Sequence, residues 1–528
     1  MELKSYQKKV IKDLADYFGY LQEHKEADKA FNSYWRDKVG AYNALSGEGM
    51  RPYQVNIPDA VHLCIKVPTA GGKTFIACNA LKTIFDAMPE NRTKAVVWLV
   101  PWSNLLDQTV KNLSDPDHPY CRKLNALFNN RIAVFEKKEL LQGANFNPSV
   151  VQEQLSIMVL NFASIRAKNK EDRKIFEQNG ALSAFALNSK DQAHVLEETD
   201  ETSLINIIRK LNPVLVVDES HNAESELSVE MLRNLNPSFI LDLTATPKDN
   251  ANIISLVPAI ELKKEHMVKL PVIVYNQQDK EGVIESALHL QQRLEALAIK
   301  QEAEGGKYIR PIVLFQAQSK TKEDNTTFDR LKEQLIKVGV PEEQIKVKTA
   351  NKDELKGVNL LDKACPVRYV ITINALKEGW DCPFAYILAS LADKSSEVDV
   401  TQILGRVLRQ PYVMKHSDPM LNLSYVITAS AKFNETLQNI IKGLKESGFS
   451  EKDYREHNAM PESEKTKELP AQSEITFNTD RVSFGSKEVS VSPAIQEIEK
   501  IALIQHAEME RQIADFDNNP SSAQLFSE

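Results

Sequence analysis

Two series of apolar runs, separated by segments with helical periodicity, constrain the fold of this chain most strongly. Each run is a nearly continuous stretch rich in Val, Ile and Leu, which is typical of strands in parallel sheets that helices cover on both faces. The first series comprises residues 61–67, 95–100, 156–160, 214–219 and 238–246. The second series comprises residues 270–276, 309–315, 344–349, 367–373 and 385–390. The predicted fold class is therefore α/β, with one parallel sheet in each of two lobes.

The length of 528 residues allows about three domains. We expect an N-terminal lobe over residues 1–260 and a C-terminal lobe over residues 261–450, with the natural linker at residues 248–269. Residues 451–528 are predicted to form a small C-terminal extension that is partly flexible.

The C-terminal extension begins with a polar stretch rich in Glu and Lys. An alternating segment follows at residues 475–484, and residues 493–516 have a helical pattern. Two interpretations stay open at this stage: a hairpin and helix packed on the core, or a partly disordered end.

The charge balance limits the kind of nucleic-acid contact that this chain can make. It has 65 basic and 73 acidic residues, a net charge of −8. A broad basic face for wrapping nucleic acid would shift this balance the other way. Any nucleic-acid contact is therefore expected in a confined groove that also uses backbone N–H groups and hydroxyls.

The cysteines and the apolar runs indicate the cellular compartment. Five widely spaced cysteines without a C-x-x-C pair argue for a reducing cytoplasm and against a disulfide framework or zinc site. The N-terminus has no apolar signal region, and no run approaches the ~18 residues that a membrane span needs. We expect a cytoplasmic protein that does not enter membranes.

The stretch VPTAGGKTF, residues 67–75, lies between an apolar run and an amphipathic segment, FIACNALKTIFDAM. It could be a glycine-rich turn with a solvated Lys73. Its place before a helix N-terminus instead favours a phosphate cradle, because backbone N–H groups and the helix dipole attract anions there. Lys73 would reach the β- and γ-phosphates, and the Thr74 hydroxyl would hold Mg²⁺. Val67 stands where the general pattern has its first glycine.

Two adjacent carboxylates, Asp218 and Glu219, end the apolar run VLVVDE. An isolated pair of this kind could be only a helix N-cap. In a chain that also carries a phosphate cradle, Asp218 can hold the Mg²⁺ that bridges phosphate oxygens, and Glu219 can orient or deprotonate the attacking water. The two motifs together predict a site that hydrolyses a nucleoside triphosphate.

The second series ends in QILGRVLRQP, residues 402–411, where Arg406 and Arg409 are three residues apart. If this segment is helical, both arginines lie on one face. They could be a solvated face or salt-bridge partners. Because the surrounding residues are apolar, we favour a role in stabilising the charge of the transferred phosphoryl group.

Six motifs give the chain a resemblance to a known family over about residues 3–445. PTAGGKT, LVPWSNLLDQ, DESH, TATP, ALKEGWD and QILGRVLRQ occur in the order of motifs I, Ia, II, III, V and VI of superfamily 2 helicases. More narrowly, WLVPWSNLLDQT, KLPVIVY, RPIVLFQAQ and ALKEGWDCPFAYILASL resemble the restriction subunit of type III restriction–modification enzymes. Helicase loops of the form PTGxGKT also lack the first glycine, which accounts for Val67.

The resemblance implies two RecA-like lobes with ATP and Mg²⁺ as ligands, and it assigns roles to individual residues. The residues implied to bind nucleotide are Gln7, Thr69, Gly71, Gly72, Lys73, Thr74, Asp218, Gly379 and Asp381, with Thr74 and Asp218 as the magnesium ligands. The residues implied in hydrolysis are Glu219, Gln402, Arg406 and Arg409. Coupling between nucleotide and nucleic acid is implied for His221, Thr244 and Thr246. Contacts with the nucleic-acid backbone are implied for Pro101, Asn104, Gln108, Asn161 and Ser164.

The sequence departs from the restriction subunits in one respect. Those proteins carry a nuclease domain with a P-D…D/E-x-K cluster after the motor, and no convincing cluster is found here. The IPD at residues 57–59 and the DPD at 115–117 lie inside the first lobe. Cleavage is therefore not expected of this chain: the nuclease is on a partner, the chain is a truncated piece, or the motor never cuts.

The expected function is an ATP-dependent translocase or helicase acting on double-stranded DNA, with ATPase activity stimulated by DNA. By resemblance it would be the motor of a type III restriction-like or other bacterial defence system, with a nuclease or methyltransferase subunit as partner. Two alternatives stay open: a stand-alone RNA or DNA helicase, and an ATP-gated binding module in a defence complex.

Overall fold

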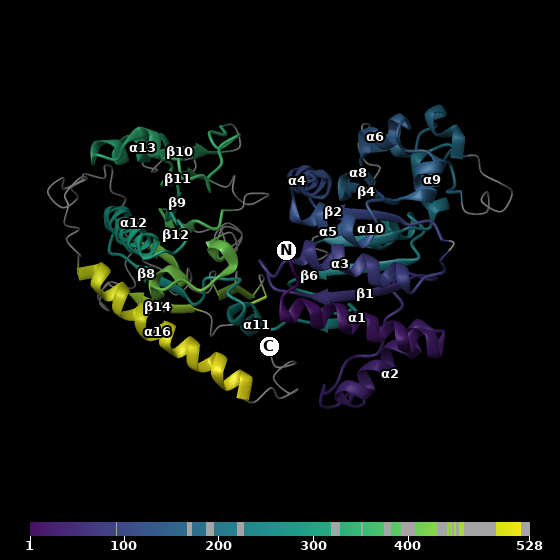
Figure 1. The fold of residues 1–528 in the computed structure, drawn as a ribbon, viewed down its shortest axis with the longest axis horizontal. Coiled ribbons are helices and arrows are strands. Elements are labelled where there is room, and N and C mark those ends of the chain that lie inside the picture. The colour runs from purple at the N-terminus through teal and green to yellow at the C-terminus, as the bar shows by residue number, and fades with distance from the viewer. Residues whose placement is uncertain are drawn as a thin grey trace. The chain divides into compact units, whose positions relative to one another are not determined.

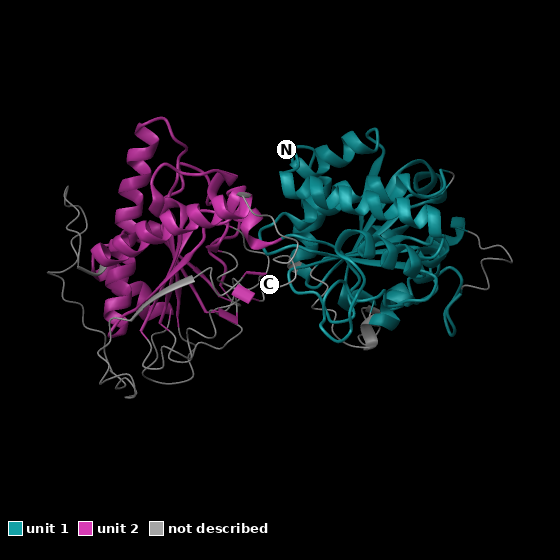
Figure 2. Cartoon of the chain, turned by 90° about the horizontal axis from the view of Figure 1, so that it is seen from below, with its two compact units in different colours: residues 1–257 teal, residues 258–528 magenta. Residues whose placement is uncertain are grey.

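The chain forms two compact units, residues 1–257 and 258–528 (Figure 2). The computed structural model describes residues 1–90, 92–165, 172–185, 195–218, 226–317, 328–349, 352–373, 382–391, 407–429, 441–442, 444–445, 448–449, 454–458 and 493–518. None of the described helices is both long and apolar enough to cross a membrane.

The first unit contains a seven-stranded sheet whose described ladders are all parallel, in the order β3-β4-β2-β5-β6-β1-β7 (Figure 1). The strands are β1 (Val61–Lys66), β2 (Ala95–Val100), β3 (Ile132–Glu136), β4 (Leu155–Asn161), β5 (Val214–Asp218), β6 (Phe239–Thr244) and β7 (Ile253–Leu256). The five runs of the first series are confirmed as β1, β2, β4, β5 and β6. The sequence reading missed only the two strands at the sheet edges.

Helices cover both faces of this sheet, as nearly continuous apolar strands require. They are α1 (Ser5–His24), α2 (Ala27–Val39), α3 (Lys73–Asp86), α4 (Ser103–Ser114), α5 (Pro119–Leu127), α6 (Lys137–Gln142), α7 (Pro148–Glu153), α8 (Phe162–Ile165), α9 (Leu204–Leu211) and α10 (Glu226–Arg233). On one face, Ile240 joins a buried apolar cluster that includes Ile205 and Ile208 of α9. Phe239, the neighbouring residue of β6, packs against Phe18 of α1 with ring centroids 5.6 Å apart.

The N-terminal helices α1 and α2 are tied to the edge strand β7, far along the chain. Asp13 of α1 accepts a hydrogen bond from the Ser255 hydroxyl at 2.7 Å and pairs with Lys38 of α2. The Trp35 indole donates to the carbonyl of Ile253 at 2.9 Å. These contacts hold α1 against the sheet, where α1 also packs on α3.

The second unit contains a second seven-stranded parallel sheet, in the order β10-β11-β9-β12-β13-β8-β14 (Figure 1). Its strands are β8 (Val272–Asn276), β9 (Ile312–Gln316), β10 (Ile345–Lys348), β11 (Tyr369–Thr372), β12 (Ala385–Ser390), β13 (Ser424–Thr428) and β14 (Tyr454–Asn458). The five runs of the second series are confirmed as β8 to β12. The predicted fold class, α/β with two parallel sheets, is confirmed.

The predicted linker at 248–269 is more structured than expected. It contains β7 of the first sheet and α11 (Ala259–Lys264), and the division between the units falls between them. A four-residue edge strand and a six-residue helix are too short to show periodicity in the sequence.

The helix predicted over residues 493–516 is confirmed as α16 (Pro493–Asn518). It belongs to the second unit, where Lys415 pairs with its Glu510 at 2.8 Å and Arg293 of α12 (Lys280–Ala303) pairs with its Glu499. The strand β14 is likewise an edge of the second sheet. The alternating segment at 475–484 lies outside the described residues.

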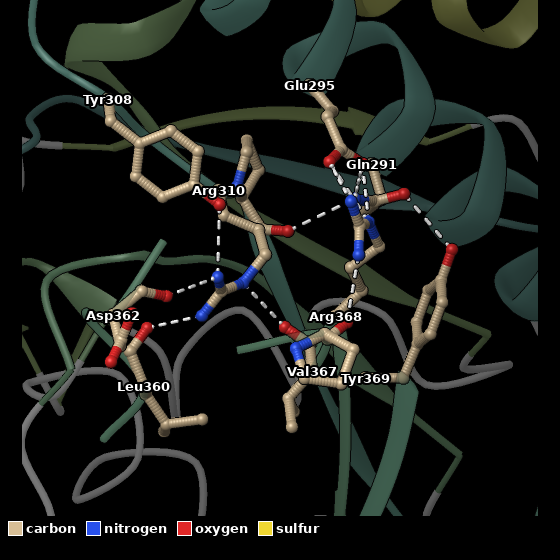
Figure 3. Close-up of polar contacts among 11 residues, drawn as sticks. Gln291, Glu295, Tyr308, Arg310, Leu360, Asp362, Val367, Arg368 and Tyr369 are labelled. Atoms are coloured by element: carbon tan, nitrogen blue, oxygen red, sulfur yellow. Dashed lines mark hydrogen bonds and ion pairs between the residues drawn. The ribbon is translucent and has the colours of Figure 1, made fainter. Parts of the chain in front are cut away.

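A buried arginine fixes the loop that precedes β11 in the second unit (Figure 3). Arg310 is only 1% exposed, and its guanidinium donates to the carbonyls of Val367 and Asp362 at 2.8 and 2.9 Å and to that of Leu360. Because each buried donor has an acceptor, the cation stabilises the loop rather than leaving its carbonyls unpaired.

Candidate active site

The glycine-rich loop lies between β1 and α3, as predicted. Its backbone enters the left-handed region at Ala70, with φ 65°, and at Gly72, with φ 75° and ψ 36°. Gly72 is the N-cap of α3, and Lys73, the first residue of that helix, is only 8% exposed. A helix N-terminus whose cap residue has no side chain is well suited to bind an anion through its N–H groups.

Gln7 of α1 lies directly against this loop. Its side-chain amide donates to the carbonyl of Gly71 at 3.2 Å, and the Tyr6 hydroxyl donates to the same carbonyl at 2.8 Å. Gly72 has φ 75°, which favours glycine, and a Cβ added there would lie 2.7 Å from the Gln7 amide nitrogen, so the Gln7 side chain would have to shift. The structure thus brings Gln7 to the loop despite the long intervening sequence. Tyr6 was missed, and no pattern in the sequence distinguishes it.

The proposed magnesium ligands, Thr74 and Asp218, converge on one point. The Thr74 hydroxyl of α3 donates to the Asp218 carboxylate at the end of β5 at 3.4 Å. A hydroxyl and a carboxylate are the hard oxygen ligands that Mg²⁺ takes, and this ion usually keeps water and substrate phosphates as its other ligands. Within the described residues, no group of three or more His, Cys, Asp or Glu side chains could hold a metal ion. The residues present therefore fit a magnesium ion that is bound together with a nucleotide.

Thr244, at the end of β6, contacts the beginning of the glycine-rich loop through its backbone. Its carbonyl accepts a hydrogen bond from the N–H of Val67 at 2.9 Å. Its hydroxyl, which is buried, accepts from the N–H of Thr246 at 3.2 Å. A shift at the end of β6 would therefore move the loop directly, as coupling between nucleotide and nucleic acid requires.

Asn161 and Ser164 lie beside the start of α4, which follows β2 and Pro101. The Asn161 side-chain amide donates to the Ser103 hydroxyl at 3.2 Å. Its oxygen accepts from the hydroxyl and the N–H of Ser164 at 2.6 and 2.8 Å. Ser164 is 5% exposed, so its hydroxyl orients Asn161 rather than facing solvent.

The helix α4 also carries the two other residues implied to contact nucleic acid, Asn104 and Gln108. The sequence reading missed Ser103, which joins this helix to Asn161. The only hint of this role in the sequence is that Ser103 directly follows the PW pair after the apolar run 95–100. Four of the five implied backbone-contact residues thus come from the segments that follow two neighbouring strands, β2 and β4, and Asn161 itself ends β4.

Arg409 does not lie on a helix, so the condition under which it would share a helical face with Arg406 is not met at this residue. Arg409 forms an isolated antiparallel bridge with Val268. The N–H of Lys269 donates to the carbonyl of Leu408 at 2.6 Å. These bonds between residues far apart in the sequence hold the backbone in an extended conformation. The hydrophobic periodicity of the sequence could not have predicted them.

Six of the predicted site residues lie outside the described residues. They are Glu219, His221, Gly379, Asp381, Gln402 and Arg406. Thr69 is described, half-buried in the turn before Gly71.

Three buried thiols near these elements have low reactivity. Burial raises the pKa of Cys64 in β1, of Cys78 in α3 and of Cys121 in α5. A thiol with a raised pKa stays protonated at neutral pH and is a poor nucleophile or metal ligand. The chemistry available at this edge of the sheet is therefore that of a lysine, a hydroxyl, a carboxylate and backbone N–H groups.

Comparison with known proteins finds a family model that is similar to the first unit. The family described as "Type III restriction enzyme, res subunit" matches residues 1–249. The narrower resemblance predicted from the motifs, to this restriction subunit, is confirmed over that part of the chain. No curated protein matches the sequence.

Several solved structures are similar in fold, at low identity. The ATP-dependent Type ISP restriction-modification enzyme LlaBIII bound to DNA is 14% identical with a TM-score of 0.49, covering 87% of this chain and 31% of that one. Dbp5 of S. cerevisiae bound to RNA and ADP BeF3 is 12% identical with a TM-score of 0.40, covering 84% and 89%. A putative HsdR subunit fragment of a type I restriction enzyme from Vibrio vulnificus YJ016 is 15% identical with a TM-score of 0.40, covering 75% and 64%. This chain thus spans about a third of the LlaBIII chain.

Proposed function

We propose that this helicase-like chain, related over residues 1–249 to the restriction subunit of type III restriction enzymes, hydrolyses ATP to move along nucleic acid. One observation carries the proposal. The glycine-rich loop, Gln7 and the pair formed by Thr74 and Asp218 come together from three distant segments of the first unit. A nucleotide bound with a magnesium ion would use each of them.

The nucleotide would be held by its phosphates at the N-terminus of α3. The backbone N–H groups of the loop and the helix dipole attract the phosphates, and Lys73 neutralises the charge on the β- and γ-oxygens. Thr74 and Asp218 would hold Mg²⁺, which supplies further charge neutralisation at the phosphates. Gln7, which lies against the loop through its bond to Gly71, would recognise the adenine, the role that the resemblance implies for it.

The hydrolysis step needs a directed water molecule and stabilisation of the charge that develops on the phosphoryl group. Glu219 follows the magnesium ligand directly in the sequence, and we assign it the orientation or deprotonation of the water. Arg406 and Arg409 would stabilise the developing charge, a contribution that is worth on the order of 10³ to 10⁵ in rate where such arginines have been studied. Gln402 would act with these arginines in hydrolysis, and Gly379 and Asp381 would complete the nucleotide contacts.

Nucleic acid would contact the same edge of the first sheet as the nucleotide. Since β1, β2, β4, β5 and β6 are parallel, their carboxyl ends meet at one edge. Pro101, Asn104, Gln108 and Asn161 follow or end β2 and β4 there, where the buried Ser164 would act by orienting Asn161. Thr244 ends β6 and Thr246 follows it. His221 would join Thr244 and Thr246 in transmitting the state of the nucleotide. The net charge of −8 favours such a confined contact over a broad basic face.

The substrate we propose is double-stranded DNA, and the cellular role is that of a cytoplasmic motor in a restriction-like or other bacterial defence system. The match to a restriction subunit over the first unit supports this choice. A nuclease or methyltransferase subunit would be the partner of such a motor.

Steady-state ATPase activity tests the proposal. The rate is measured alone, with duplex DNA, with single-stranded DNA and with RNA, and the Lys73→Ala variant serves as the blank. We expect duplex DNA to give the strongest stimulation. A Lys73→Ala protein that hydrolyses ATP at the parental rate would refute the proposed site.

The same measurement separates the alternatives. Preferential stimulation by single-stranded DNA or RNA would point to a stand-alone helicase. A slow rate that no nucleic acid changes would point to an ATP-gated binding module.

A further inference from the structure

Lys269 is a fully buried cation at the start of the second sheet. Its exposed fraction is 0%, and its ammonium donates to the carbonyls of Pro383, Ala385 and Arg409, each at 2.8 Å. The ammonium also lies 4.2 Å from the centroid of the Tyr386 ring. An ammonium has three N–H donors, so these three carbonyls satisfy it completely.

The backbone around Lys269 is joined to the same short segment, residues 408–410. The N–H of Lys269 donates to the carbonyl of Leu408 at 2.6 Å, and the N–H of Gln410 donates to the carbonyl of Met267 at 3.0 Å. Val268 and Arg409 form the bridge between these two bonds. The ammonium therefore adds a third point of attachment, and this one joins Arg409 to the beginning of β12.

The position that follows Arg409 is also fixed. Gln410 is 2% exposed, and its side-chain amide donates to the Asn422 side chain at 2.8 Å and to the carbonyl of Met414 at 3.1 Å. The backbone of Arg409 is thus held from both sides, while its side chain is only half-buried. Such support is what a side chain needs if it must be placed within a fraction of an ångström.

Burying the charged lysine side chain has a desolvation cost, which suggests that Lys269 has a role besides filling space. Burying a cation requires full compensation, and a buried methionine of similar length would leave three carbonyls unpaired but avoid the charge. Arg310 offers a comparison within the same unit, because it too is a buried cation bound to backbone carbonyls. Its carbonyl acceptors, Leu360, Asp362 and Val367, all precede β11 and include no predicted site residue.

We propose that Lys269 is a positioning residue for ATP hydrolysis, which sets the backbone of Arg409 so that the guanidinium reaches the transferred phosphoryl group. The inference rests on the proposed function of Arg409. Lys269 itself touches neither nucleotide nor reacting atoms. Its effect is expected on kcat, because a displaced arginine binds the transition state less well while the loop at Lys73 still binds ATP.

The first experiment compares Lys269→Met with Arg310→Met in the full chain. We expect Lys269→Met to lower the kcat for ATP by about 10- to 100-fold, as misplacement by about 1 Å does elsewhere, with the KM for ATP within about twofold. Arg310→Met should destabilise the unit to a similar degree but keep kcat near the parental value. A folded Lys269→Met protein with parental kcat would overturn the proposal.

A conservative pair covers the case in which the methionine variants do not fold. Lys269→Arg keeps a buried cation but places a planar guanidinium against the three carbonyls, so we expect a smaller loss of kcat at unchanged KM. Arg310→Lys is its matched control and should keep the parental kcat. Equal losses in the two variants would show that Lys269 acts only on stability.

A double-mutant cycle with Arg409→Ala separates the proposal from the proposed function. If Lys269 acts through Arg409, the Lys269→Met/Arg409→Ala protein should be no slower than Arg409→Ala alone. Fully additive losses would overturn the positioning role while leaving the role of Arg409 intact. An Arg409→Ala protein with parental kcat would instead refute the catalytic role of Arg409, and the positioning role with it.

Discussion

The two units have the same sheet topology but differ in the N-cap residue of the helix that follows their first strand. The order β10-β11-β9-β12-β13-β8-β14 repeats the order β3-β4-β2-β5-β6-β1-β7 strand for strand. After β1, the cap of α3 is Gly72, which has no side chain. After β8, the cap of α12 is Asp279, whose carboxylate accepts a hydrogen bond from the N–H of Gly282 at 2.7 Å.

This difference teaches how one fold can provide a phosphate site in one copy and close it in the other. A carboxylate at an N-cap supplies from within the chain the negative charge that a helix N-terminus attracts. Gly72 leaves that charge to a ligand. Lys73 and Lys280, which begin α3 and α12, occupy corresponding places, yet only Lys73 lies at an N-terminus without a carboxylate cap.

The largest expected effect is that of removing Lys73, with removal of Lys280 as the control. Lys73→Ala should lower the ATPase rate by roughly 10³-fold or more, because a charge that stabilises the phosphoryl group in the transition state is lost. Lys280→Ala should leave the rate within about twofold. Both rates are measured at saturating ATP with duplex DNA. Equal losses in the two variants would contradict the assignment of the nucleotide to the first unit.

The next effect concerns the glycine that caps α3. Gly72→Ala places a Cβ 2.7 Å from the Gln7 amide nitrogen and in a backbone conformation with φ 75°. We expect a loss of about 1–2 kcal/mol in the free energy of unfolding. We also expect a raised KM for ATP, since Gln7 must move.

Denaturant unfolding and ATPase kinetics measure the two effects of Gly72→Ala. Gly305→Ala is the matched control, because that glycine has φ 91° but nothing within 4 Å of an added Cβ. An unchanged KM for ATP in Gly72→Ala would indicate that Gln7 is not part of the nucleotide site.

A smaller effect is expected at the cap of α12. Asp279→Ala should cost about 1 kcal/mol in the free energy of unfolding, because the N–H of Gly282 loses its acceptor. The KM for ATP and kcat should not change. A clear loss of ATPase activity would mean that the second unit uses this helix end in catalysis, which would weaken the contrast between the units.

The smallest effect at neutral pH concerns His416, which is 2% exposed in the second unit. Burial, together with the charge of the nearby Lys269, lowers the pKa of His416 to about 4. The unfolded chain therefore binds more protons than the folded one between about pH 6.5 and 4, so stability falls as the pH falls through this window. His416→Gln should flatten this slope when melting temperature is followed from pH 7 to 4. A slope unchanged by the substitution would assign it to other groups.

The central strands could be predicted from the sequence because strands that are buried on both faces must be apolar throughout. Three of the four edge strands could not, because they lack a continuous apolar run. In β3 only Phe135 is buried, β7 is half-exposed at both ends, and β14 has the polar sequence YREHN. β13 was missed for another reason: SYVIT places polar hydroxyls at both ends of a strand that is nevertheless fully buried.

The candidate site divides in the same way. The phosphate loop and Asp218 follow strands directly, so local sequence reveals them. The contact of Gln7 with the loop depends on how α1 packs, and the extended backbone of Arg409 depends on Lys269, which is remote in sequence. The sequence did not mark Asp279 as special, because Asp is common at helix N-caps. Only the shared topology shows that it occupies the place that Gly72 has in the first unit.

The contacts between α2 and β7 affect the order in which parts of the first unit can pack while the ribosome synthesises the chain. α2 ends at Val39, but its anchors are the carbonyls of Ile253 and Ile254, which Trp35 and Tyr34 contact. The beginning of the unit must therefore wait for its last strand to leave the exit tunnel before it can be fully seated. Until then α1, which carries Gln7 to the phosphate loop, lacks the bond from Ser255 to Asp13 and relies on its packing against α3.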